Sequence, residues 1–495
     1  MSLNKFHRSK ILATIGPSSN NPEVFKQLLE SGLNAVRLNT SHGSLESHKV
    51  NIKMIREVSP EISVLVDLPG IKIRTGNLEE PISVKPGEHV VFYYSELSSP
   101  DYQGISIPID YKIVAKNVKE GSNIFINDGI LHFKIDYIDD DGIIYSKVIS
   151  GGLIESRKGI NLPGMNLGIK VPTRSDIERI NFAIDIDADF IAISFVSDRS
   201  EVHEVRKIIQ NKTNKKIGLI SKIEREEALM NFSGILEVSD GIMVARGDLG
   251  VEIAPERVPV EQRRIIYESN KFAKPVIVAT QILDSMIRNP IATRAEISDI
   301  FTAVDQGADT LMLSEETATG RYPIKAVQVM HKTALEAHNQ MRRREPAHYD
   351  SGLGGYVRIQ ELLGHAIKTM SYQARQAGNP AKAIFIPTRH GTTAKFIAKY
   401  RPRTPLIAAS SDLKVIRNLN MVWGLHNLFI EVEKDEQERV YLGGLRSPLF
   451  KNAILLSVEK GLVEKDDMIL VVSSSAVSPD SPTNLVGAFK VSDLL

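Results

Sequence analysis

Five segments decide the fold of this chain: FIAISFV (190–196), IGLISKIE (217–224), GIMVARG (241–247), PVIVATQ (275–281) and TLMLSEE (310–316). Each is a short apolar run that ends in polar or glycine residues, as expected for a parallel strand buried on both faces. Three similar runs come earlier: KILATIG (10–16), AVRLNTS (35–41) and SVLVDLPG (63–70). Amphipathic stretches such as PEVFKQLLESG and DIERINFAIDI lie between most of the runs. The repeat of strand, loop and helix predicts a closed (β/α)8 barrel.

An open, doubly wound sheet is the alternative, because it also uses βα units. Such a sheet usually carries a glycine-rich nucleotide fingerprint after its first strand, and neither GxGxxG nor GxxxxGK[ST] occurs here. The barrel is therefore favoured, with its functional groups at the ends of its strands.

Two parts of the chain fall outside the repeat. The interval after the third run is rich in Gly, Asp and alternating segments such as HVVFYYSEL, ILHFKIDYID and IIYSKVIS, which predicts an inserted β domain that acts as a lid. After the charged stretch QMRRREPAHYDSGLGG, strands such as AIFIP, LIAAS, LHNLFIEV and MILVVSSS alternate with helices. The predicted domains are a barrel at 1–75 and 168–340, a β insertion at 76–167 and a C-terminal α/β domain at 341–495.

Composition limits the classes of function. The 495 residues are 42% hydrophobic and 24% charged with a net charge of +1, so the broad basic field of a nucleic-acid binder is missing. There is no cysteine, which excludes disulfides, thiolate metal sites and a cysteine nucleophile. The first residues, MSLNKFHRSKILATIG, resemble neither a signal peptide nor a membrane span. These features predict a cytoplasmic protein that binds a small anion.

Polar residues gather at the predicted strand ends. They are Arg37, Asn39, Ser41, His42, Asp67, Lys222, Glu224, Arg246, Asp248, Thr280, Gln281, Ser314, Glu315 and Glu316. Helix capping explains any single Ser or Thr among them, but not the whole set. Lys222 and Glu224 are two apart, so both point to one face of their strand. Burying them on an apolar strand is costly unless a ligand uses them.

Glu224 and Asp248 form a pair of hard oxygen ligands that could hold Mg²⁺, if substrate and water oxygens complete the octahedron. Phosphoryl transfer needs positioned cations around the transferred group. Arg37, Lys222, Arg74 and the metal could supply them.

The sequence resembles the pyruvate kinase family over essentially its whole length. The stretches that carry the resemblance are ATIGPSS, AVRLNTSHG, DLPGIKIRTG, RKGINLPG, SKIE, DGIMVARGDLG, KPVIVATQ, TRAEISD and MLSEETATGRYP. The resemblance implies a glycolytic transferase that passes a phosphoryl group from phosphoenolpyruvate to ADP, giving pyruvate and ATP. It also implies Mg²⁺, with Mn²⁺ as an alternative, at Glu224 and Asp248, and a homotetramer.

By the same resemblance, Arg37 grips phosphate and Lys222 stabilises the phosphoryl group in flight and the enolate oxygen. Gly247, beside Asp248, and Thr280 would hold the substrate carboxylate. Thr280 and Ser314 would act with water in protonating the enolate. The implied nucleotide contacts are Arg74, Lys158, Asn39, His42 and Pro17.

Two departures from the family pattern stand out. The monovalent-cation region, formed by Asn39, Ser41 and Asp67, here contains Leu68 and Lys72 where the family commonly has a hydroxyl and an acidic residue. A lysine ammonium can replace K⁺, so we predict activity without potassium; the alternative is that Lys72 is a solvated rim residue. Glu315 stands where the family usually has Gly, which adds a carboxylate near the end of the eighth strand.

A phosphorylated allosteric effector is implied for the C-terminal domain. The residues that would bind it are Thr388, His390, Gly391, Thr392 and Thr393, with Ser473, Ser474 and Ser475 facing them. A helix N-terminus is a suitable phosphate site, although a capped helix without a ligand explains this loop equally well.

Two other functions compete with the kinase. One is a metal-dependent mutase or lyase acting on phosphoenolpyruvate, which would need no ADP; the long insertion with Arg74 and Lys158 argues against it. The other is a non-catalytic metabolite-binding protein, which would not need Arg37, Lys222 and both carboxylates together.

Overall fold

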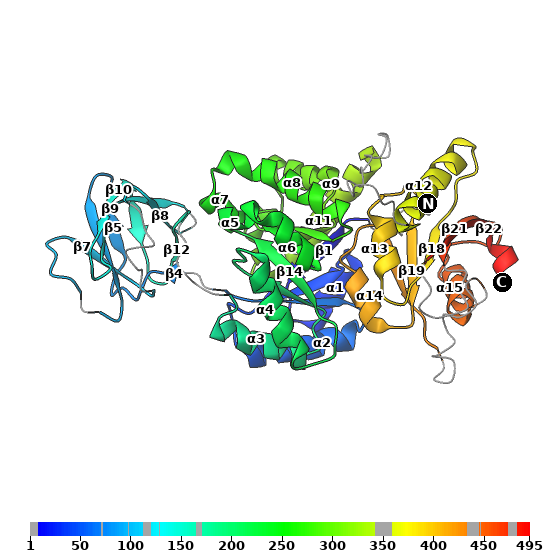
Figure 1. Cartoon of the computed structure of the whole chain (residues 1–495), viewed down its shortest axis with the longest axis horizontal. Coiled ribbons are helices and arrows are strands. Elements are labelled where there is room, and N and C mark those ends of the chain that lie inside the picture. Colours follow the sequence, from blue (N-terminus) through cyan, green and yellow to red (C-terminus); the bar gives the residue numbers. More distant parts are fainter. Residues whose placement is uncertain are drawn as a thin grey trace.

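The computed structural model describes residues 8–70, 73–97, 99–111, 120–127, 129–164, 171–341, 359–432, 445, 447–473 and 483–495. In Figure 1 the inserted β domain, the barrel and the C-terminal domain follow one another along the long axis of the molecule. No helix within these ranges is both long and apolar enough to cross a membrane.

The predicted barrel is confirmed, and its strands close in the order β1-β17-β16-β15-β14-β13-β3-β2. The strands are β1 (Lys10–Thr14), β2 (Ala35–Asn39), β3 (Ser63–Asp67), β13 (Phe190–Ile193), β14 (Gly218–Ile223), β15 (Gly241–Ala245), β16 (Val276–Ala279) and β17 (Thr310–Leu313). All neighbouring pairs are parallel. Their carboxyl ends therefore meet at one rim of the barrel.

Helices surround the barrel. They are α1 (Pro22–Glu30), α2 (Leu45–Val58), α3 (Arg174–Asp185), α4 (Arg199–Gln210), α5 (Glu226–Met230), α6 (Phe232–Val238), α7 (Arg246–Glu252), α8 (Val258–Lys271), α9 (Arg294–Gln306), α10 (Glu315–Ala318) and α11 (Pro323–Met341), with the 3₁₀ turns η3 (Pro255–Arg257) and η4 (Asp284–Ile287). Side chains that accept backbone N–H bonds fix several starts, and capping boxes at Thr173 and Thr293 begin α3 and α9.

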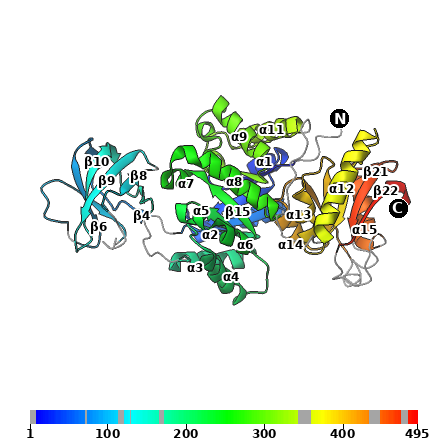
Figure 2. The same ribbon diagram turned by 45° about the horizontal axis from the view of Figure 1, so that its top comes forward.

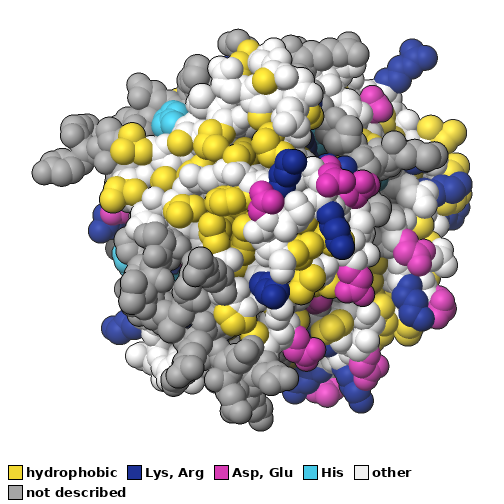
Figure 3. All heavy atoms as spheres, turned by 90° about the vertical axis from the view of Figure 1, so that its right-hand side faces the viewer, with side chains coloured by type: hydrophobic (Ala, Val, Ile, Leu, Met, Phe, Trp, Pro, Cys, Tyr) yellow, Lys and Arg dark blue, Asp and Glu magenta, His cyan; other side chains and the backbone are white. Residues whose placement is uncertain are grey.

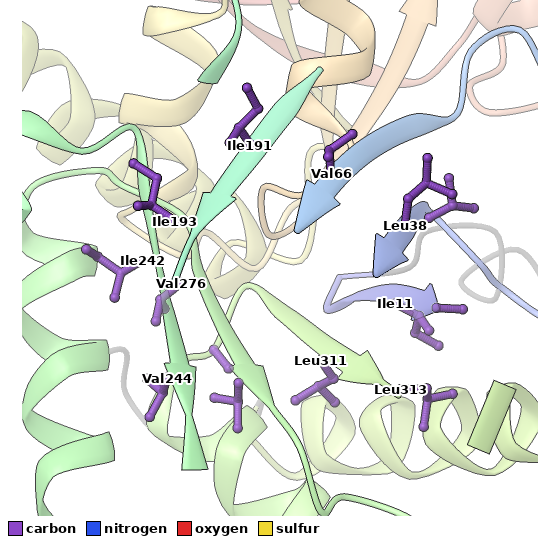
Figure 4. Packing of buried hydrophobic residues seen from close by; sticks show 14 of the residues in the cluster. Ile11, Leu38, Val66, Ile191, Ile193, Ile242, Val244, Val276, Leu311 and Leu313 are labelled. Carbon is purple, nitrogen blue, oxygen red and sulfur yellow. The ribbon is translucent and has the colours of Figure 1, made fainter. Parts of the chain in front are cut away.

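The hydrophobic core has two layers because side chains alternate along each strand. Residues such as Ile191 and Ile193 point outward to the helices, as Figure 4 shows for several strands. Ala192, between them, belongs to a separate cluster inside the barrel together with Met243 and Met312. The barrel is thus a filled core with a closed interior.

The inserted domain lies between β3 and β13, as predicted, and has a core of its own. One sheet has the order β4-β12-β8-β9-β10-β6-β7, and β11 pairs with β5. The strands are β4 (Ile73–Arg74), β5 (Ile82–Val84), β6 (His89–Tyr94), β7 (Ile105–Ile109), β8 (Asn123–Ile126), β9 (Leu131–Ile138), β10 (Ile144–Ser150), β11 (Gly152–Ile154) and β12 (Gly159–Asn161).

The C-terminal α/β domain is also confirmed, with a sheet in the order β20-β19-β18-β21-β22. Its elements are α12 (Ile359–Gln376), β18 (Ile384–Pro387), α13 (Thr392–Ala398), β19 (Leu406–Ser410), α14 (Leu413–Leu419), β20 (Leu425–Phe429), α15 (Pro448–Glu459), β21 (Met468–Ser473), β22 (Leu485–Lys490) and η7 (Val491–Leu494). One core cluster joins the sheet to α12, α13 and α14, and another joins it to α15.

The C-terminal domain closes the amino-terminal end of the barrel. Met421 lies inside the barrel cluster, and its carbonyl accepts a 2.9 Å hydrogen bond from the hydroxyl of Thr310, the first residue of β17. The ammonium of Lys10, the first residue of β1, donates to the carbonyl of Leu425 at 2.6 Å. Figures 1 and 2 both place this domain on the opposite side of the barrel from the inserted domain.

Candidate active site

A buried network of four charged side chains occupies the carboxyl ends of β2, β3 and β14. Arg37 Nε donates to Asp67 Oδ2 at 2.7 Å. Lys222 Nζ lies 3.3 Å from Asp67 Oδ1 and 2.8 Å from Glu224 Oε1. The side chains of Lys222 and Glu224 are 12% and 1% exposed, so the charges are largely removed from water. The structure therefore brings together the four residues that the sequence placed at these strand ends.

The register of the strands explains this arrangement. In the parallel pairing of β2 with β3, Arg37 lies opposite Leu65 and Asn39 lies opposite Asp67. Lys222 is near the end of β14, and Glu224 is the first residue after it. A further partner is Ser194, directly after β13, whose hydroxyl accepts a 2.7 Å hydrogen bond from Lys222.

Each charge in the network changes the pKa of its neighbours. Burial alone would lower the pKa of Lys222, but the carboxylates of Asp67 and Glu224 raise it above the ordinary lysine value. Burial would raise the pKa of Asp67, and the charges of Lys222 and Arg37 overcome that effect and lower it. Lys222 is therefore an ammonium and Asp67 a carboxylate at neutral pH.

Glu224 is held in a fixed position at the barrel rim. Its Oε2 accepts a 2.6 Å hydrogen bond from the backbone N–H of Phe195, whose φ of 56° is unusual for a bulky residue. Its Oε1 is buried and lies 2.8 Å from Lys222 Nζ. Burial raises the pKa of Glu224, the charge of Lys222 lowers it and the charge of Asp248 raises it, and the net shift is upward. A divalent cation between these two carboxylates would relieve their repulsion.

Asp248, expected at a strand end, lies in the first turn of α7, the helix that directly follows β15. The strand ends at Ala245 and the helix begins at the next residue, Arg246. The Arg-Gly-Asp segment is therefore part of the helix. Across the described ranges no group of three or more His, Cys, Asp or Glu side chains could hold a metal. Two carboxylates completed by substrate and water oxygens suit Mg²⁺ better than Ca²⁺.

A strained turn follows β16. Thr280 and Gln281 have φ values of 67° and 54°, which is costly for a β-branched residue. The Thr280 hydroxyl accepts a 2.8 Å hydrogen bond from the N–H of Gly247. Arg246 donates to the carbonyls of Thr280 at 2.9 Å and Gln281 at 3.2 Å, and it pairs with Asp299 at 2.7 Å. The turn is thus tied to the start of α7.

Three adjacent polar residues follow β17, and they differ in burial and in their hydrogen bonds. Glu316 is buried and accepts hydrogen bonds from the backbone N–H groups of Ser314 at 2.7 Å and Leu283 at 3.1 Å. Burial raises the pKa of Glu316. The hydroxyl oxygen of Ser314 is buried and has no hydrogen-bond partner among the described residues. Glu315 is exposed.

The predicted nucleotide contacts lie on three segments. Arg74 and Lys158 are close together, because Arg74 of β4 pairs with Gly159 of β12. Both side chains make contacts within the inserted domain, from Arg74 to the carbonyl of Arg157 at 3.0 Å and from Lys158 to Glu155 at 2.9 Å. Pro17 and His42 are exposed on the loops after β1 and β2, and Asn39 ends β2.

Contacts between β12 and α7 connect the inserted domain to the barrel rim. Asn161 donates to Glu252 at 3.4 Å. A Cβ atom at Gly129, in the turn after β8, would lie 3.9 Å from Val251 of α7. The insertion therefore reaches the helix that carries Asp248.

The monovalent-cation region is only partly described. Asn39 Oδ1 accepts a 3.2 Å hydrogen bond from the N–H of Ser41. The side chain of Leu68 is buried in the cluster between strands and helices, where it cannot ligate a cation. Lys72 lies outside the described residues.

The predicted effector residues are also partly described. The hydroxyl of Thr388 accepts a 2.9 Å hydrogen bond from the N–H of Gly391, and Thr393 bonds to Thr483 at 2.7 Å. His390 and Thr392 are exposed. The parallel pairing of β18 with β21 brings the loop after β18 toward Ser473. Ser474 and Ser475 lie outside the described residues.

Several residues of the rim had no predicted role. Arg246 and Glu316 were expected only at strand ends, and Ser194 and Phe195 were not singled out. Ser194 could have been predicted from the sequence, because it is a polar residue that interrupts the apolar run FIAISFV where that strand ends. Nothing in the sequence indicates that Phe195 and Thr280 adopt positive φ values.

Comparisons with known proteins identify the family. The family models described as "Pyruvate kinase, barrel domain" and "Pyruvate kinase, alpha/beta domain" match residues 6–327 and 365–487. Pyruvate kinases from Staphylococcus saprophyticus and Geobacillus stearothermophilus are each 37% identical over 495 residues, covering 99% of this chain and 81% of the relative. A crystal structure of a pyruvate kinase from Cryptosporidium parvum is 33% identical with a TM-score of 0.84, covering 98% of this chain and 96% of that one. The chain belongs to the pyruvate kinase family of phosphotransferases.

Proposed function

We propose that this enzyme transfers the phosphoryl group of phosphoenolpyruvate to ADP, giving pyruvate and ATP, in the last step of glycolysis. The observation that carries the proposal is the Lys222 ammonium, which lies between Asp67 and Glu224 and is fixed by Ser194. A preorganised cation in a site of low dielectric constant stabilises developing negative charge strongly. Such a group suits both the phosphoryl group in flight and the enolate oxygen that remains.

The other residues of the rim would orient the substrate. Arg37 is held by Asp67 and by the hydroxyl of Thr14 at 3.0 Å, so its guanidinium is rigid enough to position a phosphate. Glu224 and Asp248 would hold Mg²⁺, or Mn²⁺ in its place. When bound, the metal supplies positive charge to the phosphate oxygens and fixes their orientation.

The strained turn would receive the carboxylate and the carbon end of the substrate. The hydrogen bond from Gly247 to Thr280 joins the two residues implied for the carboxylate. The buried hydroxyl of Ser314 faces no partner among the described residues and could bind ordered water. Thr280 and Ser314 are therefore our candidates for relaying a proton to the enolate carbon.

The inserted domain would complete the nucleotide site as a lid. Arg74 lies on β4, and Lys158 directly precedes β12, the strand that pairs with β4 and contacts α7. Together with Asn39, His42 and Pro17 from the barrel loops, they would contact ADP. The limits 76–167 and 341–495 for the two smaller domains stay predictions, as does an effector site at the loop after β18. A glycolytic role would also place the enzyme in the cytoplasm.

We also propose a homotetramer. A closed assembly of four copies with two-fold axes needs two different self-complementary surfaces on each copy. Exposed Val260, Tyr267 and Phe272 on or next to α8 offer one such surface on the barrel. Figure 3 shows hydrophobic side chains gathered on the outer face of the C-terminal domain, which offers a second surface. Light scattering after gel filtration would give four times 54.9 kDa if the proposal holds.

Potassium should not be required. Leu68 contributes no ligand to the cation region, since its side chain is buried in the core. Turnover in a buffer with neither Na⁺ nor K⁺ should change by less than about twofold when KCl is added. A many-fold rise on adding KCl would refute potassium independence without affecting the assignment of the reaction.

One coupled assay separates the competing functions. Pyruvate formation from phosphoenolpyruvate should require both ADP and Mg²⁺, and EDTA should abolish it. Product formation without ADP would instead indicate a mutase or lyase. A protein that binds phosphoenolpyruvate without forming product under any of these conditions would be a non-catalytic relative.

A further inference from the structure

The loop after β2 is exposed but has a defined conformation. Ser41, His42, Gly43 and Ser44 are all exposed, so packing does little to fix them. The loop follows Asn39 and contains His42, two of the residues that our proposed function assigns to ADP. Its conformation must therefore depend on hydrogen bonds. Some of these come from the elements packed against it, namely α2, α3 and β3.

His48 of α2 supplies one of those bonds. Its side chain lies under the loop, and the residue is 6% exposed. Its Nε2 is 2.9 Å from the carbonyl oxygen of His42. A carbonyl can only accept a hydrogen bond, so Nε2 carries the proton and donates. Burial lowers the pKa of His48, the bond to His42 raises it, and the charge of Arg179 lowers it. The net lowering keeps the ring neutral at physiological pH.

The other end of the loop has its own attachments. The hydroxyl of Thr40 donates to the carbonyl of Asp67 at 2.6 Å. Arg179 of α3 donates to the carbonyl of Thr40 at 3.3 Å. The loop is therefore held at Thr40 by β3 and α3, and at His42 by α2.

The second ring nitrogen indicates that His48 does more than fill space. Its Nδ1 is buried and has no partner among the described residues. A buried polar atom without a hydrogen bond loses its hydration with nothing in return, which destabilises the fold. An apolar side chain of similar volume would avoid this cost, so packing alone favours Leu or Met here. The bond from Nε2 to the loop is the contribution that such residues cannot make.

We propose that His48 is a positioning residue that fixes the loop 40–44 for binding the nucleoside diphosphate. The inference rests on the proposed function for the identity of this ligand, whereas the effect of His48 on the loop does not depend on it.

Three variants test the proposal. His48→Leu keeps the volume and removes the donor, and His48→Gln keeps a neutral N–H donor of similar reach. His331→Leu is the matched control, because His331 is a half-buried histidine on α11, outside the barrel. Steady-state assays would vary ADP and phosphoenolpyruvate separately.

We expect His48→Leu to raise the KM for ADP about 5- to 10-fold, as for the loss of one buried hydrogen bond. The KM for phosphoenolpyruvate and kcat should stay within about twofold, and His48→Gln should restore most of the affinity for ADP. The control should leave all three constants unchanged. Equal losses for both substrates, an unchanged KM for ADP, or no recovery with glutamine would each overturn the proposal.

Hydrogen exchange gives a readout that needs no turnover. The N–H of His42 donates to the carbonyl of Asn39 at 3.3 Å, and that of Ser41 donates to Asn39 Oδ1 at 3.2 Å. Both amides should exchange about 5- to 10-fold faster in His48→Leu than in the wild type or His48→Gln. If the wild type fails to use phosphoenolpyruvate and ADP, the proposed reaction is wrong, and exchange still decides whether His48 holds the loop. Unchanged exchange would show that it does not.

Discussion

At the scale of single residues, Lys222 has two roles that can be separated by experiment. Its ammonium neutralises Asp67 and Glu224, and it also faces the rim where phosphoryl transfer is proposed. Removing it leaves buried Glu224 without that compensating charge and leaves Asp67 paired with Arg37 alone. Stability and turnover should therefore both fall, for different reasons.

We expect Lys222→Met to lower kcat roughly 100- to 1000-fold, the usual effect of removing a preorganised electrostatic group. Lys274→Met is a suitable control, because Lys274 is a partly buried lysine that donates to the carbonyls of Leu236 and Glu237, away from the barrel rim. The control should lose stability but keep kcat. Full turnover in Lys222→Met would remove the basis of the proposed mechanism.

Two buried aspartates should respond to pH in opposite directions. The pKa of Asp67 is lowered below 3.8, since Lys222 and Arg37 overcome the effect of its burial. Its ionised form therefore stabilises the fold above that pH, and this stabilisation is lost as the pH falls through the folded pKa. The pKa of Asp309 is raised above 3.8, mainly by burial, so its contribution is present at low pH and is lost as the pH rises through the folded value.

Urea unfolding of Asp67→Asn and Asp309→Asn would check these signs. The loss of stability caused by Asp67→Asn should grow from pH 3 to pH 5. The loss caused by Asp309→Asn should shrink from pH 4 to pH 7. Slopes of the same sign for the two variants would show that the charges around one of the aspartates are wrongly assigned.

The sequence predicted the positions of single side chains better than the backbone conformations around them. Lys222 and Glu224 were found because strand alternation places residues two apart on the same face. The helical position of Asp248 and the positive φ values of Phe195 and Thr280 were not, because the contacts of distant segments impose them. Such strain is common at functional sites, where the surrounding structure holds it in place.

At the scale of elements, the barrel strands were predictable because each is a continuous apolar run buried on both faces. The inserted domain was harder: HVVFYYSEL, ILHFKIDYID and IIYSKVIS correspond to β6, β9 and β10, while shorter strands such as β5 and β11 were not singled out. The edge strand β22 was missed as well, because its alternation is weak and includes Gly487. Short edge strands take their conformation from a partner more than from their own sequence.

The turn after β16 allows a prediction at this scale. Arg246 holds the carbonyls of Thr280 and Gln281 and is itself fixed by Asp299. Without these bonds the two residues should relax from positive φ toward ordinary values, and Thr280 would leave the substrate. We expect Arg246→Gln to lower kcat/KM for phosphoenolpyruvate at least about 10-fold, since small misplacements of reacting groups are costly.

Arg206→Gln provides the matched control for this element. Arg206 also binds a carbonyl, that of Val238 at 2.8 Å, and an aspartate, Asp240 at 3.0 Å, but next to the opposite end of β15. It should cost stability and leave kcat/KM unchanged. Equal activity of the two variants would mean that Arg246 only contributes to stability.

At the scale of the whole molecule, the C-terminal domain completes the barrel. Met421 is fully buried among residues of the barrel interior, so the amino-terminal end of the barrel is filled by a side chain from another domain. Trp423 lies at the same junction, where its ring faces the guanidinium groups of Arg8 at 5.5 Å and Arg401 at 4.6 Å. The barrel and the C-terminal domain should therefore unfold together.

Met421→Ala should weaken the junction between the two domains more than the rest of either domain. Truncating a buried methionine costs about 2–5 kcal/mol, and here the cavity would open inside the barrel. Trp423 is the only tryptophan of the chain, so its fluorescence reports on the junction. We expect fluorescence and far-ultraviolet circular dichroism to show one shared transition in the wild type. The variant should lose the fluorescence signal at lower urea, before most of the secondary structure unfolds.

Met330→Ala, which truncates a buried methionine of α11, is the control and should lower both signals together. If Met421→Ala also shifted both signals equally, the junction would be no weaker a point than the rest of the core.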